Sequence, residues 1–472
     1  MRNKFPLRAA LLGLCLGTTL SACNLQPHYT RPQAPISTQW PADAPTTSGK
    51  TAAAVLGWNA YFTDPAIRQL IALALANNRD LRVAAQNVEV ARGQYGVTRA
   101  ALMPNISTSV TDTGGHIPRG LYSTSSSGAV SYHVDEASVG FTSYEVDFFG
   151  KLRNETQQGL ESYLAIEGNR RTAQISLVAE VATAYLTLCS DRDLLALALQ
   201  TQKSQQDSYD ITHAKYVHDV ATSQDLSEAE ISLRDAQADI ARYRQQVSED
   251  THALHVLVGG PLPDGLLAQA SLQRDIPFAD IPSGLPSDLL TQRPDIVAAE
   301  HNLKAANANI GAARAAFFPS ITLTASAGSE SGYLHSLFGA GSGAWTFAPS
   351  ISLPIFDGGR NQGNLDVAKA QKITDVANYE KAIQTAFKEV ADALSARTND
   401  RDLYQARALD NAANELNYKT ARMRYDAGVD GYLGVLVAQR STYGSRQSLI
   451  AAQLQQATNR VTLYKVLGGG WQ

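Results

Sequence analysis

Apolar and small residues recur at alternating spacings of three and four along two long stretches of the chain. In an α-helix this spacing forms one stripe, and its persistence over many turns is typical of a coiled coil. The first stripe contains Leu226, Ala229, Leu233, Ala236, Ile240, Tyr243, Val247, Asp250, Leu254 and Leu257, and the second contains Val435, Ala438, Thr442, Ser445, Leu449, Ala452, Gln456, Asn459, Leu463 and Val466. A stack of ordinary bundle helices is the alternative, and it explains the period but not the matched strand pairs that accompany the stripes.

Four other stretches favour β-strands, two in each half of the chain. The predicted strands are 105–111, 139–148, 320–326 and 345–356. The third has the clearest period of two, because apolar and hydroxyl side chains alternate from Ile321 to Ser326. Polar, Gly/Ser-rich loops at 120–131 and 328–343 separate the strands of each pair. The pattern therefore predicts two hairpins.

Two long stretches without proline, 119–260 and 355–472, predict helices of unusual length. The run 152–217 alone would extend about 100 Å at a rise of 1.5 Å per residue. The runs 220–258 and 294–317 contain 39 and 24 residues, and together they nearly match its 66. This near-equality of length predicts a helical rod. One unbroken helix, 152–217, would run along the rod, and the two shorter helices, 220–258 and 294–317, would together run back along it.

The chain contains an internal repeat of about 210 residues. The stretch 80–104 matches 295–319, Ser143 matches Ser350, and Tyr216 matches Tyr425 at an offset of 209. The predicted organisation is a signal peptide at 1–22, an anchor and wrapping segment at 23–60, a first repeat at 61–260, a mid-rod linker at 261–286 and a second repeat at 287–472.

The N-terminus resembles the export signal of a bacterial lipoprotein. Three basic residues precede the apolar run 9–16, and Leu-Ser-Ala-Cys ending at Cys23 resembles a lipobox. Acylation of Cys23 would anchor the mature chain to a membrane, and Asn24, in place of the Asp that retains such lipoproteins, favours the outer membrane. An ordinary signal peptide with an incidental cysteine is the alternative. The formal charge of −4 becomes −7 without the leader, which disfavours nucleic acid as a partner.

Four strands are too few to close a membrane barrel, which needs at least about eight. No stretch after residue 22 is apolar enough to predict a membrane-spanning helix, so any span must consist of strands from several chains. A trimer or tetramer would leave a pore, and strand counting does not choose between them. A strand barrel continued by about 100 Å of helix would be a conduit.

The chain resembles the TolC-like outer membrane factor family, in its lipoprotein branch that serves tripartite RND efflux pumps. The resemblance covers nearly the whole mature chain and is carried by the stretches 285–323, 424–440 and 458–471 together with the lipobox. It implies an α+β membrane protein, a homotrimer with a 12-stranded β-barrel and a helical coiled-coil tunnel in the periplasm. The implied partners are a periplasmic adaptor, an inner-membrane RND transporter and outer-membrane lipid.

The tunnel's closed end is expected at the two turns between helices, 216–223 and 425–432. Acidic residues gather there and would form rings in a symmetric oligomer; solvated acids at an exposed helix end are the alternative. In the family, the gate of the second turn is formed by the leucine that matches Leu433 and by an acid four residues later. That place holds Val437 here, so apolar closure is also open. The candidate gate residues are Tyr216, Asp225, Tyr425, Asp430, Leu433 and Arg440. In the family, the residues matching Tyr425 and Arg440 make contacts between helices.

The predicted function is a passive exit duct for small molecules in the outer membrane of a Gram-negative bacterium. The sequence lacks HExxH, GxSxG and P-loop motifs, so an enzyme is not expected. No cofactor or metal is expected beyond the lipid on Cys23. The alternatives are a type I protein secretion channel, which keeps the fold and changes the cargo, and a lipoprotein scaffold that transports nothing.

Overall fold

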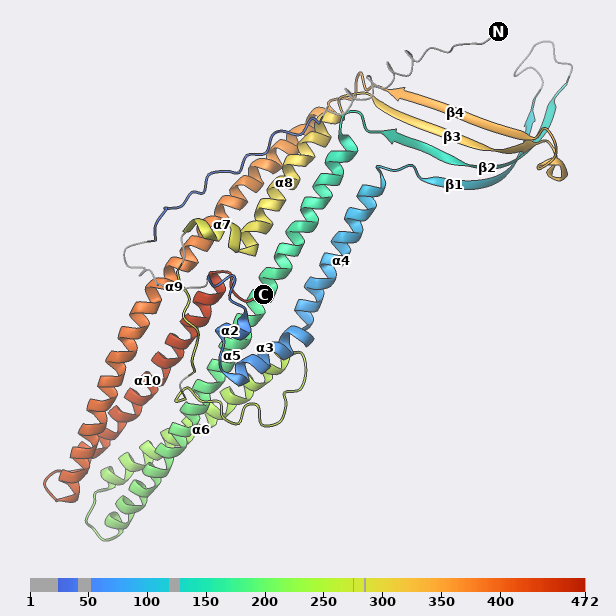
Figure 1. The fold of residues 1–472 in the computed structure, drawn as a ribbon. Helices are drawn as coiled ribbons and strands as arrows, with labels where there is room; N and C mark the ends of the chain where they lie inside the picture. The colour runs from blue at the N-terminus through green and yellow to red at the C-terminus, as the bar shows by residue number, and fades with distance from the viewer. Residues whose placement is uncertain (1–23, 41–51, 119–127, 275, 284–285, 472) are drawn as a thin grey trace. The chain divides into compact units, whose positions relative to one another are not determined.

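The computed structural model describes residues 24–40, 52–118, 128–274, 276–283 and 286–471 (Figure 1). The expected signal peptide and Cys23 lie outside the described residues. The helices are α2 (Trp58–Tyr61), α3 (Pro65–Asn77), α4 (Arg79–Ala100), α5 (Lys151–Val217), α6 (Ser223–Val258), α7 (Leu289–Gln292), α8 (Pro294–Ala315), α9 (Arg360–Asp426) and α10 (Tyr432–Val466), with short 3-10 turns η1 (Pro286–Asp288) and η2 (Leu334–Ser336). The strands are β1 (Ile106–Ile117), β2 (Val130–Val146), β3 (Ser320–Ser331) and β4 (Gly343–Ser352).

The element lengths reproduce the internal repeat. Helices α4 and α8 each have 22 residues, α5 and α9 each have 67, and α6 and α10 have 36 and 35. Each half also contributes two strands. Long proline-free stretches therefore do form long helices, because nothing in them removes a backbone donor or clashes with the preceding turn.

The chain folds into two compact units, and each is built from several segments. The first contains residues up to Pro32, Val88–Ile166 and Ala299–Tyr379, and it holds the sheet. The second contains Gln33–Asn87, Glu167–Ala298 and Glu380–Gln472, and it holds the two helical hairpins α5–α6 and α9–α10.

The four strands form one antiparallel sheet in the order β1-β2-β3-β4 (Figure 1). All four strands extend beyond the predicted ranges: β1 reaches Ile117, β3 reaches Ser331, and β2 begins at Val130, inside the expected loop 120–131. Strand β4 begins two residues early, at Gly343, and ends at Ser352 instead of residue 356. These extensions contain Gly, Asp and Glu, which strand propensity disfavours, so pairing with the neighbouring strand decides their conformation. A bulge between Phe141 and Tyr144 shifts the register of β2 against β3.

The two faces of the sheet differ in chemistry. Residues directly opposite one another in an antiparallel sheet share a face. One row across the sheet is Ile106, Phe141, Ala325 and Phe347, and the next row, on the other face, is Ser107, Gly140, Ser326 and Thr346. On the apolar face Trp345 is 78% exposed and Ile351 is 71% exposed. A single chain therefore leaves the apolar side of its sheet without a protein core against it.

In the first unit, the N-terminal segment contacts α8 through side chains spaced along that helix. Arg314 donates to the Leu25 carbonyl at 3.1 Å, and Asn307 donates to the Pro27 carbonyl at 2.8 Å. Arg31 binds Glu300 through two guanidinium nitrogens at 3.1 and 2.7 Å. The segment leading from Cys23 thus runs beside α8, and its described start lies at the helix end that precedes β3.

In the second unit, the predicted stripes lie at the helix contacts, but the two hairpins differ in polarity. The buried stripe residues of α6 are mainly apolar, among them Leu233, Ile240 and Leu254. The stripe of α10 buries Thr442 and Ser445, whose hydroxyls donate to the Asn414 carbonyl and to Asn411 Oδ1 of α9. Hydrogen bonds therefore carry more of the α9–α10 contact than of the α5–α6 contact.

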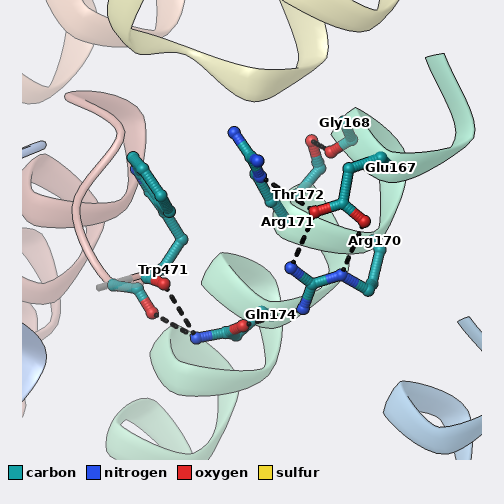
Figure 2. A network of polar contacts seen from close by, with 8 residues as sticks. Glu167, Gly168, Arg170, Arg171, Thr172, Gln174 and Trp471 are labelled. Carbon is teal, nitrogen blue, oxygen red and sulfur yellow. Dashed lines mark hydrogen bonds and ion pairs between the residues drawn. The ribbon is translucent and has the colours of Figure 1, made fainter. Parts of the chain in front are cut away.

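The end of the chain packs against α5 in the second unit. Gln174 of α5 donates to the Gly470 carbonyl at 3.4 Å and to the Trp471 carbonyl at 3.2 Å. Figure 2 shows Gln174 beside Trp471. The Arg171 guanidinium lies 5.0 Å from the centre of the Trp471 ring, and Glu167 accepts hydrogen bonds from Arg170 and Arg171. Gly470 has φ +110°, so a residue without Cβ is needed for this approach.

The expectation that no later stretch has the composition of a membrane helix was too strong. One window of 18 residues in α5 is long and apolar enough, and 56% of it is buried inside the protein. Its buried side chains include Val181, Leu186 and Leu188, which are 0% exposed. This burial is what a core helix requires, and it explains why α5 is apolar around much of its circumference.

Candidate functional site

The two turns that join α5 to α6 and α9 to α10 have the same backbone geometry. In the first, the amide of Val220 donates to the Lys215 carbonyl at 2.8 Å, and in the second that of Val429 donates to the Arg424 carbonyl at 2.9 Å. Each turn has one residue with positive φ, Asp219 at +59° and Gly428 at +72°, so both helices end in a left-handed residue. The offset of 209 predicted from the sequence therefore holds for the turns themselves.

Asp225 caps helix α6. Its Oδ2 accepts from the Thr222 amide at 2.9 Å and from the Thr222 hydroxyl at 2.7 Å, while its own amide donates to Thr222 Oγ1 at 3.1 Å. These two hydrogen bonds from Thr222 lower the pKa of Asp225 below its usual value. The structure therefore gives Asp225 a local role as half of a capping box, which the spacing Thr-x-x-Asp could have indicated. The equivalent N-cap in the second turn is Gly431, which has no side chain for capping.

Asp430 forms an ion pair with Arg424 of the same turn. Both guanidinium nitrogens Nε and Nη2 donate to its carboxylate, the latter at 3.1 Å, and both side chains are exposed. The hydrogen bond and charge of Arg424 lower the pKa of Asp430. Of the two acids singled out from the sequence, one is therefore a helix cap and the other is neutralised by an arginine.

Tyr425 connects the two hairpins. The Lys215 ammonium donates to the Tyr425 hydroxyl and lies 4.8 Å from the centre of its ring. Tyr425 also lies beside Tyr432, with ring centres 5.2 Å apart. Tyr425 of α9 therefore contacts α5 through Lys215 and α10 through Tyr432, whereas its role in a gate stays a prediction. Sequence reasoning missed Lys215, because no periodic signal joins it to a residue 210 positions away.

Leu433 and Val437 lie one turn apart on α10, with 61% and 57% of their surfaces exposed. Val429 of the turn is also 63% exposed, so the second turn presents an apolar surface to solvent. Tyr216, the equivalent of Tyr425, is exposed by 42%. Arg440 is exposed and has no hydrogen bond or ion pair with the described residues, so the contact between helices expected for it stays a prediction.

Among the described residues, no group of three or more His, Cys, Asp or Glu could hold a metal ion. A cavity of about 600 Å³ in the second unit is lined by Arg293, Glu389 and Lys465, among others. Arg293 is engaged there by Asp295 at 2.6 Å, by Glu389 at 2.8 Å and by the Val466 carbonyl. The guanidinium of Arg293 therefore links helices α8, α9 and α10 through these hydrogen bonds.

A model of the family described as outer membrane efflux protein matches residues 70–260 and 285–469. The chain belongs to this family. The two matched segments correspond to the two repeats, so the match covers the hairpins, the sheet and both turns. Members of this family are efflux channels.

Curated relatives agree with the family. The chain is 46% identical over 455 residues to the toluene efflux pump outer membrane protein TtgC of Pseudomonas putida, covering 96% of this chain and 93% of that protein. It is 40% identical over 459 residues to the outer membrane protein OprJ of Pseudomonas aeruginosa, covering 97% and 95%. The protein is therefore an outer-membrane efflux protein of the Gram-negative type.

A solved structure supports the same fold. The open state of the MtrE outer membrane channel of Neisseria gonorrhoeae superimposes with a TM-score of 0.86 at 37% identity, covering 95% of this chain and 99% of that one. The observed sheet and paired long helices are thus the TolC-like fold that the sequence predicted.

Proposed function

We propose that three copies of this chain form the outer-membrane exit duct of a tripartite efflux system. The observation that carries this proposal is the sheet with an exposed apolar face and an opposite face of Ser, Thr and Gly. In water such an apolar face would need a protein core against it, whereas in a membrane barrel lipid covers it and the polar face lines the pore.

Closure of the sheet requires other copies of the chain. Strands β1 and β4 are the two edges, and unpaired backbone groups at an edge are not tolerated in lipid. Pairing β4 of one copy with β1 of the next would remove every edge. Three copies would give 12 strands, enough for an open pore. The likeness to the MtrE outer membrane channel supports this arrangement.

The duct would conduct passively. A periplasmic adaptor and an inner-membrane RND transporter would supply the cargo and the energy. Relatives are named for toluene and antibiotic efflux pumps, which supports small apolar or amphipathic compounds as the cargo. Type I protein secretion is the other candidate, and none of the relatives cited here is named for it.

The resting gate would lie at the turns of the two hairpins. Asp225 and Asp430 already have partners, whereas Leu433 and Val437 are exposed and apolar. We therefore favour closure by packing of Leu433 and Val437 from three copies over closure by an acidic ring. Opening would need α9–α10 to separate from α5–α6, and the Lys215–Tyr425 contact would resist that separation.

Cys23 would carry the lipid anchor. The chain two residues later, at Leu25, is held by Arg314 near the end of α8, and β3 starts at Ser320. This contact would place an acylated cysteine near the level at which the helices give way to the sheet, where acyl chains could enter the membrane. No other covalent group or cofactor is proposed.

Deletion of the gene tests the proposed function. We expect the deletion strain to become more sensitive to solvents, antibiotics, dyes or detergents, and the wild-type gene to restore resistance. Proteins released into the medium should be unchanged. Normal susceptibility together with one missing secreted protein would instead identify a secretion channel, and normal results in both assays would point to a scaffold.

Complementation with Cys23→Ala tests the anchor separately. The variant should be exported without incorporating labelled palmitate, whereas wild-type protein should incorporate it. Incorporation that is unaffected by the substitution would place the lipid elsewhere.

A further inference from the structure

Two aspartates face each other across the α5–α6 hairpin. Ala198 of α5 packs in one cluster with Tyr243 of α6, which fixes the register of this antiparallel pair. Asp191 lies seven residues before Ala198, and Asp250 lies seven residues after Tyr243. Seven residues are close to two helical turns, and the two helices run in opposite directions. The two carboxyl groups therefore lie on the same seam between α5 and α6, two turns away from the Ala198–Tyr243 contact.

Two side-chain acceptors in this part of the hairpin have no hydrogen-bond partner among the described residues. Asp250 Oδ2 is shielded from solvent and has no hydrogen-bond partner among the described residues. Gln246 Oε1, one turn earlier on α6, is in the same condition. Two carboxylates that meet in this way can form a hydrogen bond only if one of them carries a proton.

No cation neutralises the pair. Within the part of the chain that the structure describes, no Lys, Arg or His nitrogen lies within 4.0 Å of either carboxylate, and the nearby charge on α6 is Glu249. The neighbouring cations are turned elsewhere: Arg192 donates to the Leu267 carbonyl, and Arg68, the charged residue of the adjacent α3, donates to the Phe62 carbonyl. Among these described residues, no cationic side chain therefore offsets the charge of the two aspartates.

We propose that Asp191 and Asp250 share one proton, and that this shared proton makes the packing of α5 against α6 sensitive to pH. With the proton present, one carboxyl donates to the other across the helices. Without it, two partly buried negative charges repel at a point where the helices must touch. The shared proton between Asp191 and Asp250 does not depend on the proposed gate. That the pair meets the pH of the periplasm rests on the proposed function.

Burial and the charge of Asp191 raise the pKa of Asp250 to about 7. Burial raises the pKa of Asp191 as well. Because the pKa in the folded protein lies above its ordinary value, the stabilising state is the protonated one, and it is lost as pH rises through about 7. The protonated fraction should fall about tenfold between pH 6 and pH 8.

Infrared spectroscopy of the full-length protein in lipid nanodiscs, at pH 6 and pH 8 with chelator present, tests the proposal. We expect a protonated-carboxyl C=O band at pH 6 that falls about tenfold at pH 8, with a matching rise in hydrogen exchange of α5 and α6 amides near the pair. Asp250→Asn should remove the band and the pH dependence of exchange, since Asn can donate to Asp191. Asp191→Asn provides a second variant with the same expectation.

Glu249→Gln is the matched control, because it removes an exposed acid from the same helix and leaves the pair intact. It should retain the band. Absence of the band from the wild-type protein at pH 6, or its persistence in both Asn variants, would overturn the proposal. Loss of the wild-type band on adding Ca²⁺ or Mg²⁺ at pH 6 would also overturn it, because the pair would then be a cation site.

Discussion

Asp219 and Gly428 occupy the same backbone position in the two hairpin turns, with φ of +59° and +72°. A left-handed conformation costs a residue with a side chain roughly 1–2 kcal/mol, less for Asp, and costs Gly almost nothing. In the first turn, Asp219 is thus held in a left-handed conformation that it disfavours. In the second turn, Gly428 adopts the same conformation without this cost.

Exchanging these two residues should have opposite effects on the turns. Asp219→Gly should stabilise the α5–α6 turn by a few tenths to about 1 kcal/mol, because the relief of strain exceeds the added freedom of the unfolded chain. Gly428→Asp should destabilise the α9–α10 turn by about 1 kcal/mol. Hydrogen exchange of the amides of Val220 and Val429 measures each effect locally. Effects of the same sign would show that φ does not decide the stability of the turns.

Loss of the Lys215–Tyr425 contact should favour an open duct. Lys215→Met keeps the aliphatic stem and removes the ammonium, and Tyr425→Phe keeps the ring and removes the hydroxyl. Each change removes roughly 0.5–1.5 kcal/mol of interaction, which corresponds to a two- to tenfold rise in the open fraction. Conductance of purified protein in planar bilayers measures this rise.

The control for that experiment is Lys203→Met, which removes an exposed ammonium from the same helix, α5, and should leave conductance unchanged. The double variant Lys215→Met/Tyr425→Phe should exceed either single variant by less than the sum of their effects, since both remove the same contact. Additive effects would mean that the two side chains act independently.

The N-terminal segment should come loose when Glu300 is removed. The side chain of Glu300 is 6% exposed. It forms ion pairs with Arg31 and Lys304 and accepts a hydrogen bond from the Tyr29 hydroxyl. Glu300→Ala should cost about 1–2 kcal/mol, because Arg31 is about half exposed and its contribution is partly screened. Hydrogen exchange of residues 25–31 should rise. Arg92→Ala, which breaks an exposed pair with Glu89, should change stability by less than about 0.5 kcal/mol.

The same contact should persist to low pH. Burial raises the pKa of Glu300, but the hydrogen bonds and charges of Arg31 and Lys304 outweigh it, so the pKa is lowered overall. A lowered pKa means that the stabilisation is present above the ordinary value of 4.5 and is lost only as pH falls below it. Release of the segment at pH 6 to 7, followed by the same exchange measurement, would contradict this assignment.

Sequence periodicity predicted the helices well because their cause is local. A proline-free run with a three-four stripe specifies both length and buried face, as in α6 and α10. Long-range contacts have no such signal: nothing near Lys215 indicates Tyr425, and nothing near Arg31 indicates Glu300. Asp225 shows a different limit, because its capping motif was visible but the cluster of acids was interpreted as a gate.

The strands were the hardest elements to delimit, for a physical reason. Strand patterns are clear where one face packs on a core, as at Ile321 to Ser326, and weak where both faces meet solvent or lipid. The outer part of β2 carries Asp135, Glu136 and Gly140, which reduce strand propensity. Only pairing across the sheet establishes that these residues are extended.

A charge placed on either face of β4 should test whether the sheet lies in a membrane barrel. Phe347 is on the apolar face in the middle of the strand, and its neighbour Thr346 is on the hydroxyl-rich face. Phe347→Arg should destabilise the inserted protein by about 2–4 kcal/mol, because the guanidinium would face the hydrocarbon region, whereas Thr346→Arg should be tolerated because it would face the water-filled pore. The amount of heat-resistant trimer in the outer-membrane fraction compares the two variants, which differ by one position and carry the same new charge. If Thr346→Arg were the more damaging of the two, the faces would be reversed, and equal tolerance of both would mean that lipid does not cover this sheet.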